Sequence, residues 1–293
     1  MSIINNAHPG SNLRVLTQID RVLLRMGKPV ERERLLELCR PDNLPKTTGA
    51  GMRFQAELNF WLKQGLWLSQ NDVLAPHPGA RPEDLPFRVM QVLVQHDAQR
   101  KSRRSLTDSE AEPVLPFFRG ISCLLALKAH TFIGGIPLTR RSMVETIIAH
   151  LPDGLNENHT LDDLGDFLGF LEPWDRNAQI VDPTRAIEAV LPSLLKAGKE
   201  VALKEFIASL AERLPVLDGG LHRMEAENLM VARGWQPPPQ HLISASLSQA
   251  LIRLWKSGRI ILEQKADDAD HLELLFPEGG RPFSVVRLHG ASA

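Results

Sequence analysis

The first part of the chain alternates amphipathic segments with short turns. In residues 12–26, apolar side chains recur at three- and four-residue spacing while arginines occupy the other face, which predicts an amphipathic helix. A second short helix is predicted over 31–39 and a third over about 50–64, with Gly65 as its C-terminal cap. Residues 66–76 then predict a strand, a polar turn and a strand. Three helices followed by a hairpin are the order of elements in a winged helix.

The last third of the chain repeats this pattern. Helices are predicted near 185–196, 199–213 and 240–257, followed by strands over 259–263, 271–276 and 283–288. Moving the first pattern by 193 positions places Lys63 on Lys256 and Gly65 on Gly258. This match has a physical reason, because the third helix must end at a residue that adopts a left-handed conformation before the chain reverses into the hairpin.

The middle of the chain shows a weaker form of the same pattern. It predicts four helices and a pair of short strands, over 84–100, 114–130, 139–150, 160–170 and 171–182. Asp182 and Pro183 are typical of a helix start, with the aspartate as N-cap and the proline at the first helical position. No register matches the third helix of this segment to the other two.

These patterns together predict a mainly α protein with short β-hairpins, built from three tandem winged-helix-like modules. The modules are an N-terminal winged helix at 1–80, a helical middle module at 81–183 that ends in a winged-helix-like unit, and a C-terminal winged helix at 184–293. The length of 293 residues agrees with several modules, because a single domain has about 150 residues.

Composition places the chain among ordinary globular proteins. Hydrophobic residues make up 43% and charged residues 24%, which excludes a disordered or fibrous protein. Cys39 and Cys123 are too few for a disulfide framework. The chain starts without a signal-peptide pattern, and its longest apolar run, 121–127, is far shorter than the about 20 residues of a membrane span. We therefore expect a cytoplasmic protein with no membrane partner.

The net charge of −1 hides an uneven distribution. Residues 1–80 carry +3, 81–130 carry +2, 131–183 carry −6 and 184–293 are neutral. The densest basic cluster is Arg100, Lys101, Arg103 and Arg104. Such a cluster can bind phosphates without recognising base sequence. The alternative is a solvated helix end, where cations also suit the helix dipole.

Motifs typical of enzymes are absent from the sequence. It contains no phosphate-binding glycine loop, no Gly-x-Ser-x-Gly elbow and no His-Glu-x-x-His pair. Asp162 and Asp166 could hold a metal ion, but acidic residues are favoured near a helix N-terminus by the dipole alone. The acidic turn 267–270 lacks the glycine and distal glutamate of a calcium loop. We therefore predict a non-enzymatic protein without cofactor or metal.

The third helix of a winged helix usually enters the major groove of DNA. The candidate DNA contacts in the first module are Lys46, Thr47, Thr48, Arg53, Gln55 and Lys63. Those in the third module are Ser244, Ser246, Gln249, Arg253, Lys256 and Arg259. Winged helices also dock on proteins, and the acidic segment 131–183 would repel phosphates, so we expect a protein partner there.

Three leucine-rich runs carry a resemblance to a known family. Residues 35–41, 58–67 and 250–260 resemble the corresponding parts of the DpdG family, which belongs to islands that insert 7-deazaguanine derivatives into DNA and restrict unmodified DNA. The resemblance implies a non-catalytic member of a DNA modification-restriction or phage-defence assembly. It transfers no catalytic residues.

Three functions are therefore open. The first is a protein that binds double-stranded DNA and docks on other subunits of a defence or DNA-processing complex, either as a monomer or as a homodimer. The second is a dimeric winged-helix transcription regulator, which would recognise a palindromic site. The third is a pure scaffold whose modules dock on an ATPase or a nuclease.

Overall fold

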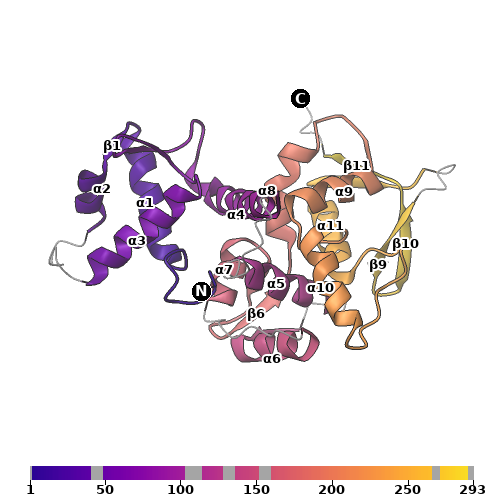
Figure 1. The fold of residues 1–293 in the computed structure, drawn as a ribbon. Coiled ribbons are helices and arrows are strands. Elements are labelled where there is room, and N and C mark those ends of the chain that lie inside the picture. Colours follow the sequence, from indigo (N-terminus) through magenta and orange to yellow (C-terminus); the bar gives the residue numbers. More distant parts are fainter. Residues whose placement is uncertain are drawn as a thin grey trace. The chain divides into compact units, whose positions relative to one another are not determined.

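Helices dominate the structure, a computed structural model that describes residues 2–40, 49–102, 114–127, 136–151, 160–265 and 271–289 (Figure 1). The strands form small antiparallel sheets, so the predicted mainly α class with short hairpins is confirmed. The chain divides into two compact units, 1–114 and 115–293. Within the described residues, no helix is both long enough and apolar enough to cross a membrane.

The first unit begins with the helices and the hairpin that the periodicity predicts. Its elements are α1 (Leu13–Met26), β1 (Val30–Glu31), α2 (Arg32–Cys39), α3 (Gly49–Lys63), β2 (Leu68–Gln70), β3 (Val73–Ala75), the short 3-10 helix η1 (Pro82–Asp84) and α4 (Leu85–Ser102). The strands form one antiparallel sheet in the order β1-β3-β2, with Val30 opposite Leu74. Leu16, Ile19 and Trp61 are fully buried between α1 and α3 and make up much of the core.

A buried ion pair ties α4 to this unit. The guanidinium of Arg88 on α4 donates hydrogen bonds of 3.0 and 2.7 Å to the carboxylate of Asp20 on α1. Trp67 donates a third hydrogen bond, of 2.9 Å, from its indole to the same carboxylate. The sequence prediction placed this helix in the middle module, because a charged partner on α1 has no signature in hydrophobic periodicity.

The second unit holds the remaining elements. They are α5 (Leu115–Leu127), β4 (Leu138–Thr139), α6 (Arg140–His150), α7 (Leu161–Phe167), β5 (Leu171–Pro173), β6 (Ala178–Val181), α8 (Thr184–Leu194), β7 (Val201–Ala202), α9 (Leu203–Arg213), α10 (Leu221–Val231), α11 (Ala245–Lys256), β8 (Ile260–Glu263), β9 (Leu272–Phe276), β10 (Gly279–Phe283) and β11 (Val285–Leu288). Two of its sheets have three antiparallel strands, in the orders β4-β6-β5 and β7-β11-β8.

One order of elements therefore occurs three times among the described residues. A helix, a strand, two helices and two further strands follow one another, and in each sheet the last strand lies between the first two. The third occurrence contains two additions. Helix α10 is inserted before α11, and the hairpin β9–β10 is inserted between β8 and β11.

The turn that ends the third helix is the same in all three occurrences. Gly65, Gly169 and Gly258 have φ angles of 80°, 82° and 69°. In each case the glycine N–H donates to the carbonyl three residues back, and the next N–H donates to the carbonyl five residues back. The structure therefore supplies the register of the middle segment that the sequence did not reveal. It also shortens the predicted helix 160–170, because α7 ends at Phe167 to form this turn.

The start of α8 differs by one position from the prediction. Pro183 precedes the helix, and Thr184 is its first residue. The carboxylate of Asp182 nevertheless caps the helix, because Oδ1 accepts hydrogen bonds from the Thr184 N–H at 2.9 Å and from the Thr184 hydroxyl at 2.5 Å. The aspartate thus has the predicted capping role from one residue further away.

Candidate nucleic-acid interface

Helix α3 presents a largely polar face to solvent in the first unit, on which Met52 is also 70% exposed. Its other side is anchored by Leu58 and Trp61, which are fully buried. Arg53, Gln55 and Lys63, all candidates from the sequence, are exposed. Within the described part of the chain, neither Arg53 nor Lys63 forms an ion pair, so both charges are available to a ligand.

Arg32, the first residue of α2, links the hairpin β2–β3 to α3. Arg32 donates from Nε to Asp72 Oδ1 at 2.9 Å and from a terminal guanidinium nitrogen to Asn59 Oδ1 at 2.5 Å. Asn71 and Asp72 form the tight turn with φ angles of 50° and 63°, the geometry of a two-residue hairpin. Asn59 lies on the exposed side of α3. Helix face and hairpin turn therefore form one connected surface.

A buried acid lies on the inner side of α3. Glu57 is only 3% exposed and accepts hydrogen bonds from the Trp61 indole N–H at 3.0 Å and from the Asn12 backbone N–H at 3.3 Å. Burial raises the pKa of Glu57 to about 8, although these two hydrogen bonds act in the opposite direction. The N-terminal segment before α1 is thus attached to α3 through an acid that takes up a proton more readily than usual.

Part of the predicted interface lies outside the described residues. This holds for Lys46, Thr47, Thr48, Arg103 and Arg104. Arg100 and Lys101 lie on the last turn of α4, and nothing is described of their side chains. The acidic turn 267–270 also falls outside.

In the third occurrence of the pattern, the helix equivalent to α3 is buried. Helix α11 packs against α8, β8 and β9. Ser244, Ser246 and Gln249, three candidate contacts from the sequence, are all less than 9% exposed. Their polar neighbour Ser248 is also buried, and its hydroxyl donates to the Ile243 carbonyl at 3.1 Å and accepts from the Leu275 N–H at 2.9 Å. These serines and Gln249 are interior residues, so the expectation that they contact DNA is corrected.

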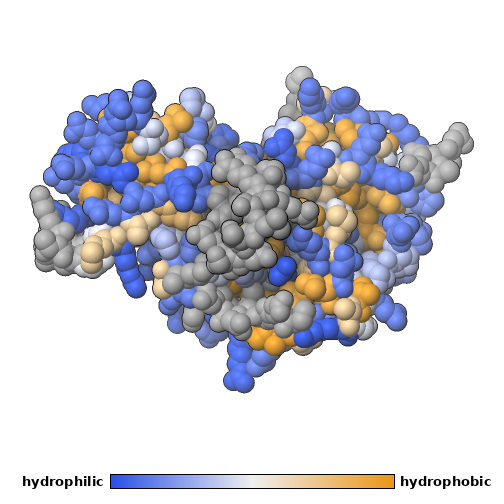
Figure 2. Space-filling model, in the orientation of Figure 1, coloured by the Kyte–Doolittle hydropathy of each residue, from blue (hydrophilic) through white to orange (hydrophobic). Residues whose placement is uncertain are grey.

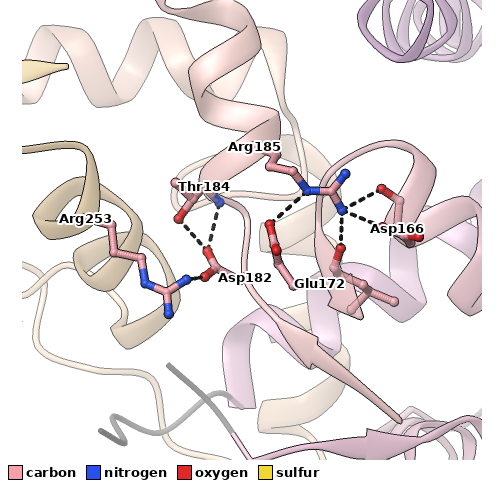
Figure 3. Close-up of polar contacts among 7 residues, drawn as sticks. Asp166, Glu172, Asp182, Thr184, Arg185 and Arg253 are labelled. Carbon is pink, nitrogen blue, oxygen red and sulfur yellow. Dashed lines mark hydrogen bonds and ion pairs between the residues drawn. The ribbon is translucent and has the colours of Figure 1, made fainter. Parts of the chain in front are cut away.

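Arg253 and Arg259, near the end of this helix, have carboxylate partners, and Figure 3 shows that of Arg253. Arg253 forms an ion pair with Asp182, whose side chain is fully buried, while Arg253 itself is 41% exposed. Arg259 donates from Nε to Glu188 at 2.5 Å. Lys256 is exposed between them on the last turn of α11. These three residues belong to the second unit, whereas Arg53 and Lys63 belong to the first.

The acidic residues of the middle segment are held by arginines. Arg185 donates to Glu172 at 2.8 Å and to the Asp166 carboxylate at 2.6 Å, as Figure 3 shows. Arg140 pairs with Asp162 at 2.8 Å. Asp162 and Asp166 thus have separate cationic partners, and no group of three or more potential metal ligands occurs within the described ranges.

Helix α10 has an unusual distribution of side chains, and the sequence did not reveal it. His222 and Arg223 are each 1% exposed, whereas Leu221, Met224 and Val231 are exposed. The His222 ring stacks on Phe118 of α5 with centroids 4.5 Å apart. Arg223 donates to Glu227 at 2.5 Å. Two polar residues of this helix therefore face the core, together with Ala226 and Met230, while three apolar residues face solvent.

The fold and this surface define a mainly helical protein whose first unit exposes a polar helix face beside a short hairpin. Over residues 1–268 the chain matches the family model described as DpdG-like, and it therefore belongs to the DpdG-like family. Membership of this family indicates a role in a DNA modification system. No curated protein and no solved structure matches the chain.

Proposed function

We propose that the protein is a non-enzymatic, DNA-binding component of a DNA modification-restriction or phage-defence complex, and that its three repeated arrangements are winged-helix modules. The order of elements, the sheet order and the shared glycine turn support the winged-helix assignment. The observation that carries the DNA-binding proposal is the exposed face of α3, where Arg53 and Lys63 form no ion pair within the described residues and Asn59 is linked through Arg32 to the β2–β3 turn.

The first module is the DNA-binding one in this proposal. A winged helix contacts DNA through a third helix that is accessible, and α3 exposes Arg53, Gln55 and Lys63. Helix α11 is enclosed, and Arg253 and Arg259 already neutralise carboxylates. Among the candidates of the third module, Lys256 alone keeps an exposed cation without an ion pair within the described residues.

The experiment measures the affinity of the full-length protein for short duplex DNA by fluorescence anisotropy at low salt. We expect weak binding that decreases as salt rises, because phosphate contacts release condensed counterions. The double variant R53Q/K63Q is expected to bind at least several-fold more weakly. K196Q/K199Q, which removes two exposed cations from the second unit, is the matched control. Absence of wild-type binding at low salt would contradict the proposal.

A protein-docking role is the second candidate function. Exposed apolar side chains on a surface are typical of protein contacts, and Leu221, Met224 and Val231 share the solvent side of α10. Arg233, just after this helix, donates to the Ile148 carbonyl at 3.0 Å, which brings the exposed Ile148 of α6 beside the end of α10. Figure 2 shows hydrophobic surface on this part of the second unit.

Pull-down from native cells followed by mass spectrometry tests the docking role. The wild-type protein and the variant L221D/M224D serve as baits, and Lys199→Asp is the control for added negative charge. A subunit of the same modification system that is retained by the wild type and by the control, but lost with L221D/M224D, would support docking through α10. Equal recovery by all three baits would contradict it.

Two further experiments separate the remaining alternatives. A dimeric transcription regulator would select one palindromic sequence from random duplexes, whereas the proposed backbone contacts would select none. A pure scaffold would show no duplex binding at low salt while retaining its protein partner.

A further inference from the structure

Three arginines form a straight row on the solvent side of α1. Arg14, Arg21 and Arg25 are exposed, as are Gln18 between them and Lys28 just after the helix. An α-helix turns 100° per residue, so positions 14, 18, 21 and 25 lie within one narrow strip, and from Arg14 to Arg25 the strip is about 16 Å long. We call these five residues the α1 stripe.

The α1 stripe faces away from α3. Leu16, Ile19 and Leu23, on the opposite side of the same helix, are fully buried in the core that α1 shares with α2 and α3. A ligand on the α1 stripe would therefore occupy a different face of the unit from a ligand on Arg53 and Lys63.

No carboxylate neutralises the α1 stripe within the described residues. Asp20, the acid on α1 itself, is buried and bound by Arg88. Glu37 on the neighbouring α2 pairs with Arg34, and Asp84 on η1 pairs with Arg81. Like charges one helical turn apart, such as Arg21 and Arg25, weaken a helix when nothing compensates them. The α1 stripe is thus a concentrated positive charge with no ion-pair partner among the described residues of its unit.

The side chains of the α1 stripe fit some anionic partners better than others, among an acidic protein, a membrane surface and duplex DNA. Of the exposed large apolar side chains in the described chain, none lies on α1. Hot spots of protein interfaces, arginines included, lie in well-packed pockets that exclude water, and an interfacial membrane helix needs an apolar face toward the lipid. A row of guanidinium groups without either suits a regular array of phosphates, which arginine binds through paired hydrogen bonds. Duplex DNA offers about one negative charge per 1.7 Å of its axis.

We propose that the α1 stripe binds the phosphate backbone of duplex DNA without recognising base sequence. This extends the proposed function with a second contact surface, and the two surfaces can be tested independently. Together they would allow the first unit to hold DNA on two of its faces.

The test compares full-length variants by fluorescence anisotropy on short duplexes of two unrelated sequences over a series of salt concentrations. The triple variant R14Q/R21Q/R25Q keeps helix-forming side chains and the buried face of α1. Its matched control is K196Q/K199Q/R213Q, which removes three exposed cations from the second unit. Circular dichroism checks that both variants keep the wild-type helix content and melting temperature.

The expected result for R14Q/R21Q/R25Q is an equal loss of affinity on both duplexes, of at least tenfold at low salt. The slope of log K against log salt is expected to become shallower by about 2.7, since each phosphate contact contributes about 0.9. The control triple is expected to change the slope by less than one.

Several results would overturn the proposal. They are an unchanged slope, a loss no larger than that of the control, or a loss confined to one duplex sequence. Wild-type binding to phosphatidylserine vesicles that the triple variant loses, with duplex binding unchanged, would also reject DNA as the partner. A loss with R53Q/K63Q but not with R14Q/R21Q/R25Q would leave the α3 proposal standing alone. The reverse pattern would support the α1 stripe and reject α3.

Discussion

Arg88 neutralises Asp20 in the interior of the first unit, with both oxygens of the carboxylate bonded to the guanidinium. The side chains are 12% and 1% exposed, respectively. A buried carboxylate that loses its cation keeps the desolvation penalty without the compensating attraction, which typically costs about 3–5 kcal/mol.

We therefore expect Arg88→Met to lower the free energy of unfolding of the first unit by about 3–5 kcal/mol. Urea unfolding followed by tryptophan fluorescence measures the change, because Trp61 and Trp67 lie in this unit. Arg81→Met is the control, since Arg81 forms only exposed ion pairs, and its unfolding midpoint should equal that of the wild type. A wild-type midpoint for R88M would contradict a stabilising role of the pair.

The second prediction concerns pH. Burial raises the pKa of Glu57 from 4.5 to about 8, so the folded state binds this proton more tightly than the unfolded state does. The contribution of Glu57 to stability is full below pH 4.5 and decreases as the pH rises to about 8, with a slope of up to about 1.4 kcal/mol per pH unit. Glu57→Gln should remove this slope, while the exposed Glu37→Gln should retain it. Urea midpoints between pH 5 and pH 8 measure both, and an equal pH dependence for wild type and E57Q would refute the assignment.

A third prediction concerns the turn after α7. Gly169 has a left-handed φ of 82°, and a Cβ atom there would lie 2.7 Å from the backbone nitrogen of Ala186. Gly198 has a similar φ of 72° but open space around it. Gly198→Ala should therefore cost about 1 kcal/mol from backbone strain alone, and Gly169→Ala clearly more, because the start of α8 must also move. Thermal melts of both variants test this, and equal melting temperatures would show that the close approach is tolerated.

The fourth prediction concerns Arg253, which the sequence suggested as a DNA contact. Its partner Asp182 is fully buried, so Arg253→Met should leave this carboxylate with the Thr184 hydrogen bonds but without its cation and lower the stability of the second unit by about 3 kcal/mol. Lys256→Met, on the same helix but exposed, should not change stability. Differential scanning calorimetry distinguishes the two. Equal unfolding temperatures for R253M and wild type would argue that solvent reaches Asp182 when the pair is broken.

Elements whose buried side is apolar were predictable from the sequence. Helix α1 buries Leu16, Ile19 and Leu23 at helical spacing, and both its location and its end agree with the prediction. The shared turn at Gly65 and Gly258 was predictable because only one residue type adopts that φ freely.

Helix α10 was missed because part of its pattern is inverted. Its buried side contains His222 and Arg223, which resemble surface residues in a sequence, while Leu221 and Met224 face solvent. Serines of α11 show the opposite error, because they were predicted to lie at the surface and are buried. Polar residues with internal hydrogen-bond partners can be core residues. Which arginine meets which carboxylate depends on contacts between distant segments, and the pairing of Arg253 with Asp182 has no local signature.

Arg32 fixes the position of the β2–β3 turn relative to α3. Because one guanidinium holds both Asn59 of α3 and Asp72 of the hairpin turn, helix and turn are joined before any ligand arrives. A partner that contacts one of them therefore meets the other at a set spacing. Less conformational entropy is then lost on association than with a freely moving hairpin.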